Sequence, residues 1–306
     1  YYPLTEWFFG HLKHGALPLW LPSIFGGYPL FADGEIGMAH PLVLLAGLLF
    51  SAETGMTVLR LVHFQIAGAL MYWLAVVLGL RPFGASIAAL VFAYGSFLVG
   101  HMQHDNILRS AVWLPGLLAL LELALRADGV ARLRFTLMAG IVVGIQLLGV
   151  HIQPVLISLL AGAGWVLVGP LRPSIRPHET ATSGFRRWQR VIGSHVRQCW
   201  IWSLVVIVGV LAAAVQLIPL FVFSGLTVRG GGVNYYVSTS YAISPPELLT
   251  LILPYFFRTG PEQHWSLWPP QETTLYLGVL PIMLSLVAVF FVRSRLVWLL
   301  TLGALD

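Results

Sequence analysis

Two short polar segments between long apolar stretches carry histidine beside other groups that bind anions. GHMQHDNILR and GVHIQP contain His101, Gln103, His104, Asp105, Arg109, His151 and Gln153. Imidazole, amide and guanidinium groups donate hydrogen bonds to phosphate oxygens, so these residues predict the binding of a polar or phosphate-bearing substrate. The alternatives are a capped helix junction for the first segment and an ordinary interfacial turn for His151.

The first of these segments also raises the question of a metal. His101 and Asp105 are four residues apart, so on a helix they would share a face. Imidazole and carboxylate groups together can hold a divalent metal, but this spacing is not diagnostic of one. The sequence therefore predicts no metal ligands and leaves a divalent metal open as a cofactor.

Three acids lie beside apolar sequence and are candidates for acid–base chemistry. Asp33 and Glu35 follow Gly26-Gly27, where the chain can turn sharply. Glu272 opens another apolar run, either as a helix-terminus residue or as a substrate contact. Carboxylates at a membrane surface are costly unless they are used, so we predict catalytic roles for Asp33 and Glu35 and substrate binding for Glu272. An amphipathic surface loop is the alternative for the first two.

Composition shows which kind of fold must position these residues. The 306-residue chain is 58% hydrophobic and 9% charged, with a mean hydropathy of +0.83, which is typical of an integral membrane protein. Its sixteen Arg and one Lys then mark orientation in the membrane, which argues against a nucleic-acid partner. The one cysteine, Cys199, excludes an internal disulfide.

Apolar stretches of membrane-spanning length predict an all-α bundle of about eight transmembrane helices. They lie near residues 54–79, 83–100, 108–125, 135–150, 154–170, 200–222, 273–292 and 296 onward. Residues 151–153 predict a tight turn before Pro154, with one long bent helix as the alternative. Because the chain begins at Tyr1 and ends at Asp306 within an apolar run, we expect further spans on either side.

The segments between the predicted spans alternate in charge, and this alternation predicts the orientation of the chain in the membrane. Arginines gather in every second gap, above all in 171–199, and the positive-inside rule makes those gaps cytoplasmic. Residues 1–53 form a first extracytoplasmic loop, in which Pro and aromatic residues predict short interfacial helices. Residues 54–306 form the transmembrane domain, with an extracytoplasmic loop at 224–272. All the candidate site residues then lie on the extracytoplasmic face.

An ordered set of motifs resembles the YfhO-type bacterial membrane proteins of the GT-C glycosyltransferase superfamily. The set comprises GALPLWLPSIFGGYPLFAD, HPLVLL, GHMQHDNILRSAVWLPGLLALLE, GVHIQP, PELLTLILPYFF and ETTLYLGVLPIML. The resemblance implies a GT-C bundle in the bacterial cytoplasmic membrane, with a large first outer loop. It implies transfer of a sugar from a polyprenyl-phosphate carrier to a cell-envelope acceptor such as a teichoic-acid-like polymer.

The chain departs from the family pattern in ways that bear on the site. Leu21 replaces an Asn and His40 a Tyr, so identical acceptor binding is not implied. The superfamily's principal carboxylate follows the first span, and we expect it to lie upstream of Tyr1. Asp33 occupies a position where the family also admits Asn.

The resulting hypothesis is inverting transfer on the outer face. A loop carboxylate would deprotonate the acceptor, and the histidines, Arg109 and either Arg229 or Arg258 would bind the leaving phosphate. Trp20, Tyr28 and Tyr276 are candidates for stacking on sugars. A flippase or transporter of a lipid-linked sugar is the main alternative, and a non-catalytic assembly partner is another. Charged residues are almost absent from mid-span, which favours surface chemistry over transport.

Overall fold

The computed structural model describes residues 1–169, 184–228, 230–258 and 264–292. Within these ranges the regular structure is helical, and the only β interaction is an isolated bridge between Leu21 and Tyr28. The helices are α1 (Tyr2–Lys13), α2 (Leu30–Asp33), α3 (Pro41–Leu49), α4 (Ala52–Val77), α5 (Pro82–Tyr94), α6 (Ser96–Gly100), α7 (Asp105–Ala111), α8 (Leu114–Arg126), α9 (Gly129–Leu148), α10 (Ile152–Val168), α11 (Gly184–Ser224), α12 (Tyr235–Ser238), a 3₁₀ helix (Pro245–Leu251), α13 (Pro270–Thr273) and α14 (Val279–Phe291).

The predicted multi-pass helical architecture is confirmed. Five segments are long and apolar enough to cross a membrane: α4, α5 with α6, α7 with α8, α9, and His195–Ser224 of α11. Two predicted spans are shorter as helices, Ile152–Leu167 of α10 and α14. The run from residue 296 lies outside the described residues, so the predicted count of eight is not confirmed.

Local sequence explains where several helices begin. Ser51 caps α4 by accepting a hydrogen bond from the backbone N–H of Thr54, at 3.3 Å. Ser244 and Glu247 form a reciprocal capping box at the start of the 3₁₀ helix. Helices α9 and α10 are separated by a turn in which Val150 has a φ of 58°. A tight turn between the two helices is therefore confirmed and one long bent helix is excluded, but the turn lies at residues 149–151 because α10 already begins at Ile152.

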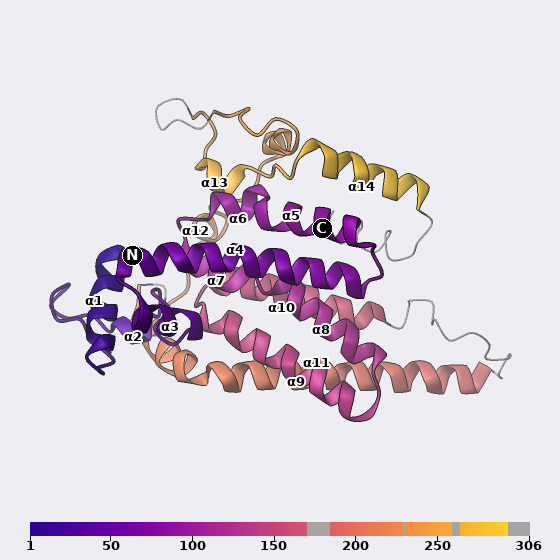
Figure 1. Ribbon diagram of the computed structural model, residues 1–306, viewed down its shortest axis with the longest axis horizontal. Helices are drawn as coiled ribbons and strands as arrows, with labels where there is room; N and C mark the ends of the chain where they lie inside the picture. Colours follow the sequence, from indigo (N-terminus) through magenta and orange to yellow (C-terminus); the bar gives the residue numbers. More distant parts are fainter. Residues whose placement is uncertain (170–183, 229, 259–263, 293–306) are drawn as a thin grey trace.

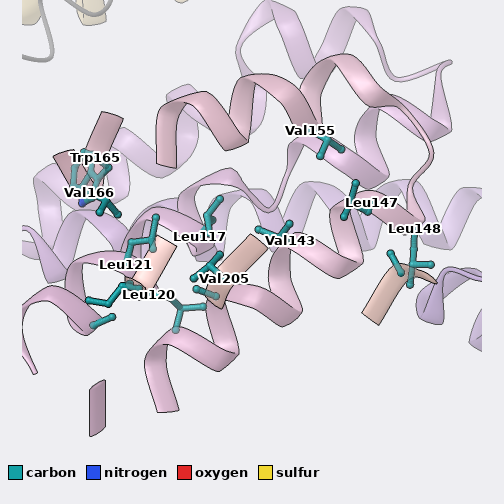
Figure 2. Close-up of a cluster of buried hydrophobic side chains, with 14 residues drawn as sticks. Leu117, Leu120, Leu121, Val143, Leu147, Leu148, Val155, Trp165, Val166 and Val205 are labelled. Carbon is teal, nitrogen blue, oxygen red and sulfur yellow. The ribbon is translucent and has the colours of Figure 1, made fainter. Parts of the chain in front are cut away.

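The core of the bundle is the crossing of α9 and α11. An added Cβ at Gly140 would lie 2.6 Å from Val208, and one at Gly209 would lie 2.6 Å from Val143. Gly140 and Gly144 form a small-residue pair spaced by four, which lets the two backbones approach closely. Around this crossing a buried cluster joins α8, α9, α10 and α11 (Figure 2).

The loops and short helices divide between the two ends of the bundle (Figure 1). Helices α1 to α3, the α6–α7 turn, the α9–α10 turn and the end of α11 lie at one end. The α4–α5 and α8–α9 turns, which carry Arg81 and Arg126, lie at the other. This arrangement agrees with the predicted separation of the polar outer segments from the arginine-rich gaps.

Three segments differ from their predicted structure. Helix α11 begins at Gly184, so part of the predicted loop 171–199 is helical, and residues 171–183 lie outside the described ranges. The outer loop 224–272 contains α12, the 3₁₀ helix and most of α13. Glu272 belongs to α13 and does not open a long span, because residues 274–278 are not helical.

Matched glycine substitutions test the α9–α11 crossing. An added Cβ at Gly144 would lie 2.8 Å from Ala212, whereas one at Gly164 on α10 meets open space. We expect Gly144→Ala to cost about 1–3 kcal/mol through overpacking, and Gly164→Ala to gain up to about 1 kcal/mol from helix propensity. Thermal unfolding of both variants in detergent checks this. Equal stabilisation by both substitutions would contradict the close crossing.

Candidate functional site

The centre of the candidate site is the acidic turn, residues 29–37, which carries Asp33 and Glu35. Gly34 and Gly37 have φ values of 74° and 71°, which glycine adopts without strain. An added Cβ at Gly34 would lie 2.6 Å from the Gln216 amide nitrogen and 2.9 Å from Val150. The turn therefore packs directly on α11 and on the α9–α10 turn, and its glycines permit that approach.

Side chains from two spans hold the backbone of the acidic turn. Gln216 of α11 donates to the carbonyl of Phe31 at 2.8 Å. Arg109 of α7 donates to the carbonyl of Glu35 at 2.5 Å and to that of Ile36 at 3.1 Å. These bonds satisfy backbone acceptors that would otherwise face apolar helices.

The two carboxylates of the turn have different environments. Glu35 is exposed and accepts a 2.8 Å hydrogen bond from the Tyr1 hydroxyl. Burial raises the pKa of Asp33, and the charge of Glu35 adds to the increase; hydrogen bonds from Tyr28 and the Glu35 N–H oppose it. Burial and the bond to Asp33 raise the pKa of Tyr28 to about 12, so its hydroxyl remains a donor at neutral pH. Asp33 is the better candidate for a general base.

Histidines surround the same region. His101 is buried, its Nδ1 lies 2.8 Å from the carbonyl of Phe97, and its Nε2 lies 3.6 Å from Glu272 Oε2. The rings of His101 and His104 are 5.6 Å apart. Burial lowers the pKa of His151, which also feels the charges of Glu35, His101, His104 and Glu272. His151 is therefore within electrostatic reach of both the acidic turn and the histidines of the α6–α7 turn.

Some predicted site residues have other partners. The sequence predicts that His101 and Asp105 share one face of a helix. In the structure residues 101–104 form a turn between α6 and α7, so the two residues do not share a helix face. Asp105 pairs with Arg60 of α4 at 2.8 Å. Arg109 is buried, and its two terminal nitrogens donate to carbonyl groups while its Nε has no hydrogen-bond partner in the described chain; the predicted phosphate contact stays a prediction.

The remaining candidates lie at the edge of this region or elsewhere. Gln103 is exposed in the α6–α7 turn, and Gln153 is exposed at the start of α10. Trp20 packs its ring against Gly27, and Arg258 is exposed with a φ of 58°. Arg229 lies outside the described residues. Within the described part of the chain no group of three His, Cys, Asp or Glu residues is arranged to hold a metal, so the open question of a divalent metal gains no support.

The sequence prediction misses two buried amides. Gln216 contacts the acidic turn, and Gln146 of α9 donates to the carbonyl of Ser110 and the hydroxyl of Ser158. Both lie inside apolar spans and carry no charge, so a search for charged span ends passes over them. Isolated glutamine inside an apolar helix is the signal that would have found them, since a buried amide needs partners.

An open groove of about 1120 Å³ lies beside the histidines. Gly100 and Gln271, the neighbours of His101 and Glu272, contribute to its wall. Tyr94, Tyr255, Trp268 and Tyr276 add aromatic surface, and Ser96 fixes one edge by donating to the carbonyl of Thr274 at 2.7 Å. The groove therefore adjoins the chain segments that carry His101 and Glu272.

No family model, curated protein or solved structure matches the chain. Function is therefore inferred from the residues and their geometry.

The Tyr28–Asp33 bond yields a test of the proton affinity of the acidic turn. Tyr28 lowers the pKa of Asp33, so Tyr28→Phe should make this carboxyl ionise at higher pH than in the wild type. Infrared difference titration, with the carboxyl band assigned through Asp33→Asn, measures the midpoint. A midpoint that is unchanged or lower in Tyr28→Phe would contradict the bond.

A buried histidine pair connects the first loop to α4. The rings of His40 and His63 are 5.8 Å apart, and both nitrogens of His40 lack a hydrogen-bond partner in the described chain. Burial, with the nearby charge of Arg109, holds the pKa of His40 well below its usual 6.5. His40 is therefore neutral in the folded chain.

Acid should weaken the docking of residues 1–50. As the pH falls below about 6.5, His40 takes up a proton when residues 1–50 are unfolded but stays neutral when they are folded. The free energy of unfolding of this segment therefore decreases in that pH range. His40→Leu should remove part of this loss, while the exposed control His14→Leu should not. Hydrogen exchange of residues 1–50 against pH measures both. Identical acid sensitivity of the two variants would exclude this role.

Proposed function

We propose that the chain is a membrane glycosyltransferase of the YfhO and GT-C type. It transfers a sugar from a polyprenyl-phosphate carrier to a cell-envelope acceptor on the extracytoplasmic face. One observation carries the proposal: carboxylates from the first loop and histidines from two distant turns meet at one end of a bundle of membrane-spanning helices. The ordered motifs that resemble the YfhO-type proteins support the same function.

In the proposed reaction Asp33 acts as the general base. Burial raises its pKa, so the carboxylate binds a proton more readily than an ordinary aspartate does. It removes the proton of the acceptor hydroxyl, whose oxygen attacks the anomeric carbon of the sugar. The bond between that carbon and the phosphate oxygen breaks, and its electron pair leaves with the polyprenyl phosphate.

The histidines stabilise the leaving phosphate. His101 has its Nδ1 on the carbonyl of Phe97, which directs Nε2 toward Glu272. His104 lies beside it, and His151 faces the same charges from the α9–α10 turn. Because the Nδ1 N–H of His101 donates to the Phe97 carbonyl, Nε2 can donate to the phosphate only when the ring is protonated, and Glu272 is then its counter-ion. Donors fixed around a developing phosphate anion lower the barrier because little reorganisation is needed. The adjacent groove would receive the carrier or the acceptor chain.

Transfer in proteoliposomes tests the proposal. The protein is incubated with polyprenyl-phosphate sugars carrying a radioactive label and with envelope polymer, and label in the polymer is counted. Asp33→Asn should lower kcat by about 10²- to 10⁴-fold, the usual contribution of a general base, with little change in KM. His101→Ala should also lower kcat.

Glu6→Gln is the matched control, because Glu6 is an exposed acid on α1 of the same loop. It should transfer at the wild-type rate. Label that crosses the bilayer without reaching the polymer would overturn the proposal in favour of a flippase. Equal transfer rates for Asp33→Asn and Glu6→Gln would show that Asp33 is not the general base.

A further inference from the structure

We infer that Arg109 and Gln216 are positioning residues that hold Asp33 in place for the reaction. This inference rests on the proposed function, because it concerns the same site. Each acts through the backbone of the acidic turn.

Arg109 binds the backbone on the C-terminal side of the acidic turn. Its guanidinium donates to two successive carbonyls, those of Glu35 and Ile36, and its side chain is buried. Gly37 carries no side chain where an added Cβ would lie 2.9 Å from the guanidinium carbon. The hydrogen bonds of the Asp105 carboxylate come from Arg60. Both terminal nitrogens of Arg109 are thus used on backbone acceptors, while its Nε has no hydrogen-bond partner in the described chain.

Gln216 binds the backbone on the N-terminal side of the acidic turn. It lies within the apolar part of α11, is fully buried, and donates to the carbonyl of Phe31, 185 residues earlier in the chain. Gly34 again makes room, since an added Cβ would lie 2.6 Å from the amide nitrogen. Burying an amide inside a span costs free energy unless the amide has a hydrogen-bond partner, and the Phe31 carbonyl is that partner.

The two contacts bracket Asp33. Phe31 lies two residues before it and Glu35 two residues after it, and the bonds come from different spans. Together they hold the backbone on both sides of Asp33. Because burial raises the pKa of Asp33, the same contacts maintain its proton affinity.

A pair of equivalent substitutions separates positioning from general stability. Gln216→Met and Gln146→Met each replace a fully buried glutamine by an apolar side chain of similar length, but only Gln216 contacts the acidic turn. Both variants should unfold at lower temperature. Only Gln216→Met should release the turn, and Arg109→Lys should do so too because lysine lacks the planar fork.

The expected readout is the titration of Asp33. With the turn loosened, Asp33 becomes more solvated and its pKa falls toward the ordinary value, so the infrared midpoint and the acid limb of the pH–rate profile move to lower pH. In the transfer assay kcat should fall by about tenfold to hundredfold, as expected for a misplaced catalytic group, while the KM for the carrier is retained. Gln146→Met should leave the midpoint and kcat near wild type.

The outcomes separate this inference from the proposed function. Suppose that wild-type protein transfers no sugar while Gln216→Met and Arg109→Lys still shift the Asp33 infrared midpoint. In that case the proposed function fails, but Arg109 and Gln216 do position Asp33. If transfer occurs and neither variant shifts the midpoint, or Gln146→Met shifts it equally, the inference is overturned.

Discussion

The structure depends on satisfying the backbone of an irregular segment that packs against apolar helices. A membrane-spanning helix uses its own carbonyl and N–H groups internally and offers none to a neighbouring loop. The first fifty residues nevertheless pack on α4, α7 and α11, and their turns present carbonyls to those helices. Arg109 and Gln216 supply the missing donors, so two polar side chains inside spans determine where the acidic turn lies.

The chemistry of the site follows from that placement. Burial raises the pKa of Asp33 in the acidic turn, whereas Glu35, two residues away, is exposed. Gly34 lies against Val150, the neighbour of His151, and the charge of Glu35 reaches that histidine. Glu272 approaches His101 from α13. Segments separated by more than two hundred residues therefore share one end of the bundle, as Figure 1 shows.

What the sequence could predict was local or periodic. Spans are recognised from the length and apolarity of a single stretch, and the turn before Pro154 involves residues a few positions apart. The grouping of polar segments at one end follows from alternation along the chain.

The missed features are long-range contacts. The bonds of Arg109 and Gln216 join residues 73 to 185 positions apart, and no spacing rule connects such pairs. The expectation for His101 and Asp105 was wrong because it extended a helix through residues 101–104, where the chain turns. Which of several polar side chains binds substrate and which supports the backbone depends on burial, and burial is visible only in the folded chain.

The central claim is that the acidic turn and both histidine turns share one membrane face, and cysteine labelling in sealed, right-side-out vesicles tests it most directly. In a Cys199→Ser background, Glu35→Cys, Gln103→Cys and Gln153→Cys replace exposed residues of the site, and Val130→Cys replaces an exposed residue at the other end of α9. A membrane-impermeant maleimide should label the first three in sealed vesicles and Val130→Cys only after the membrane is opened. Labelling of the three site positions from different sides would contradict the account.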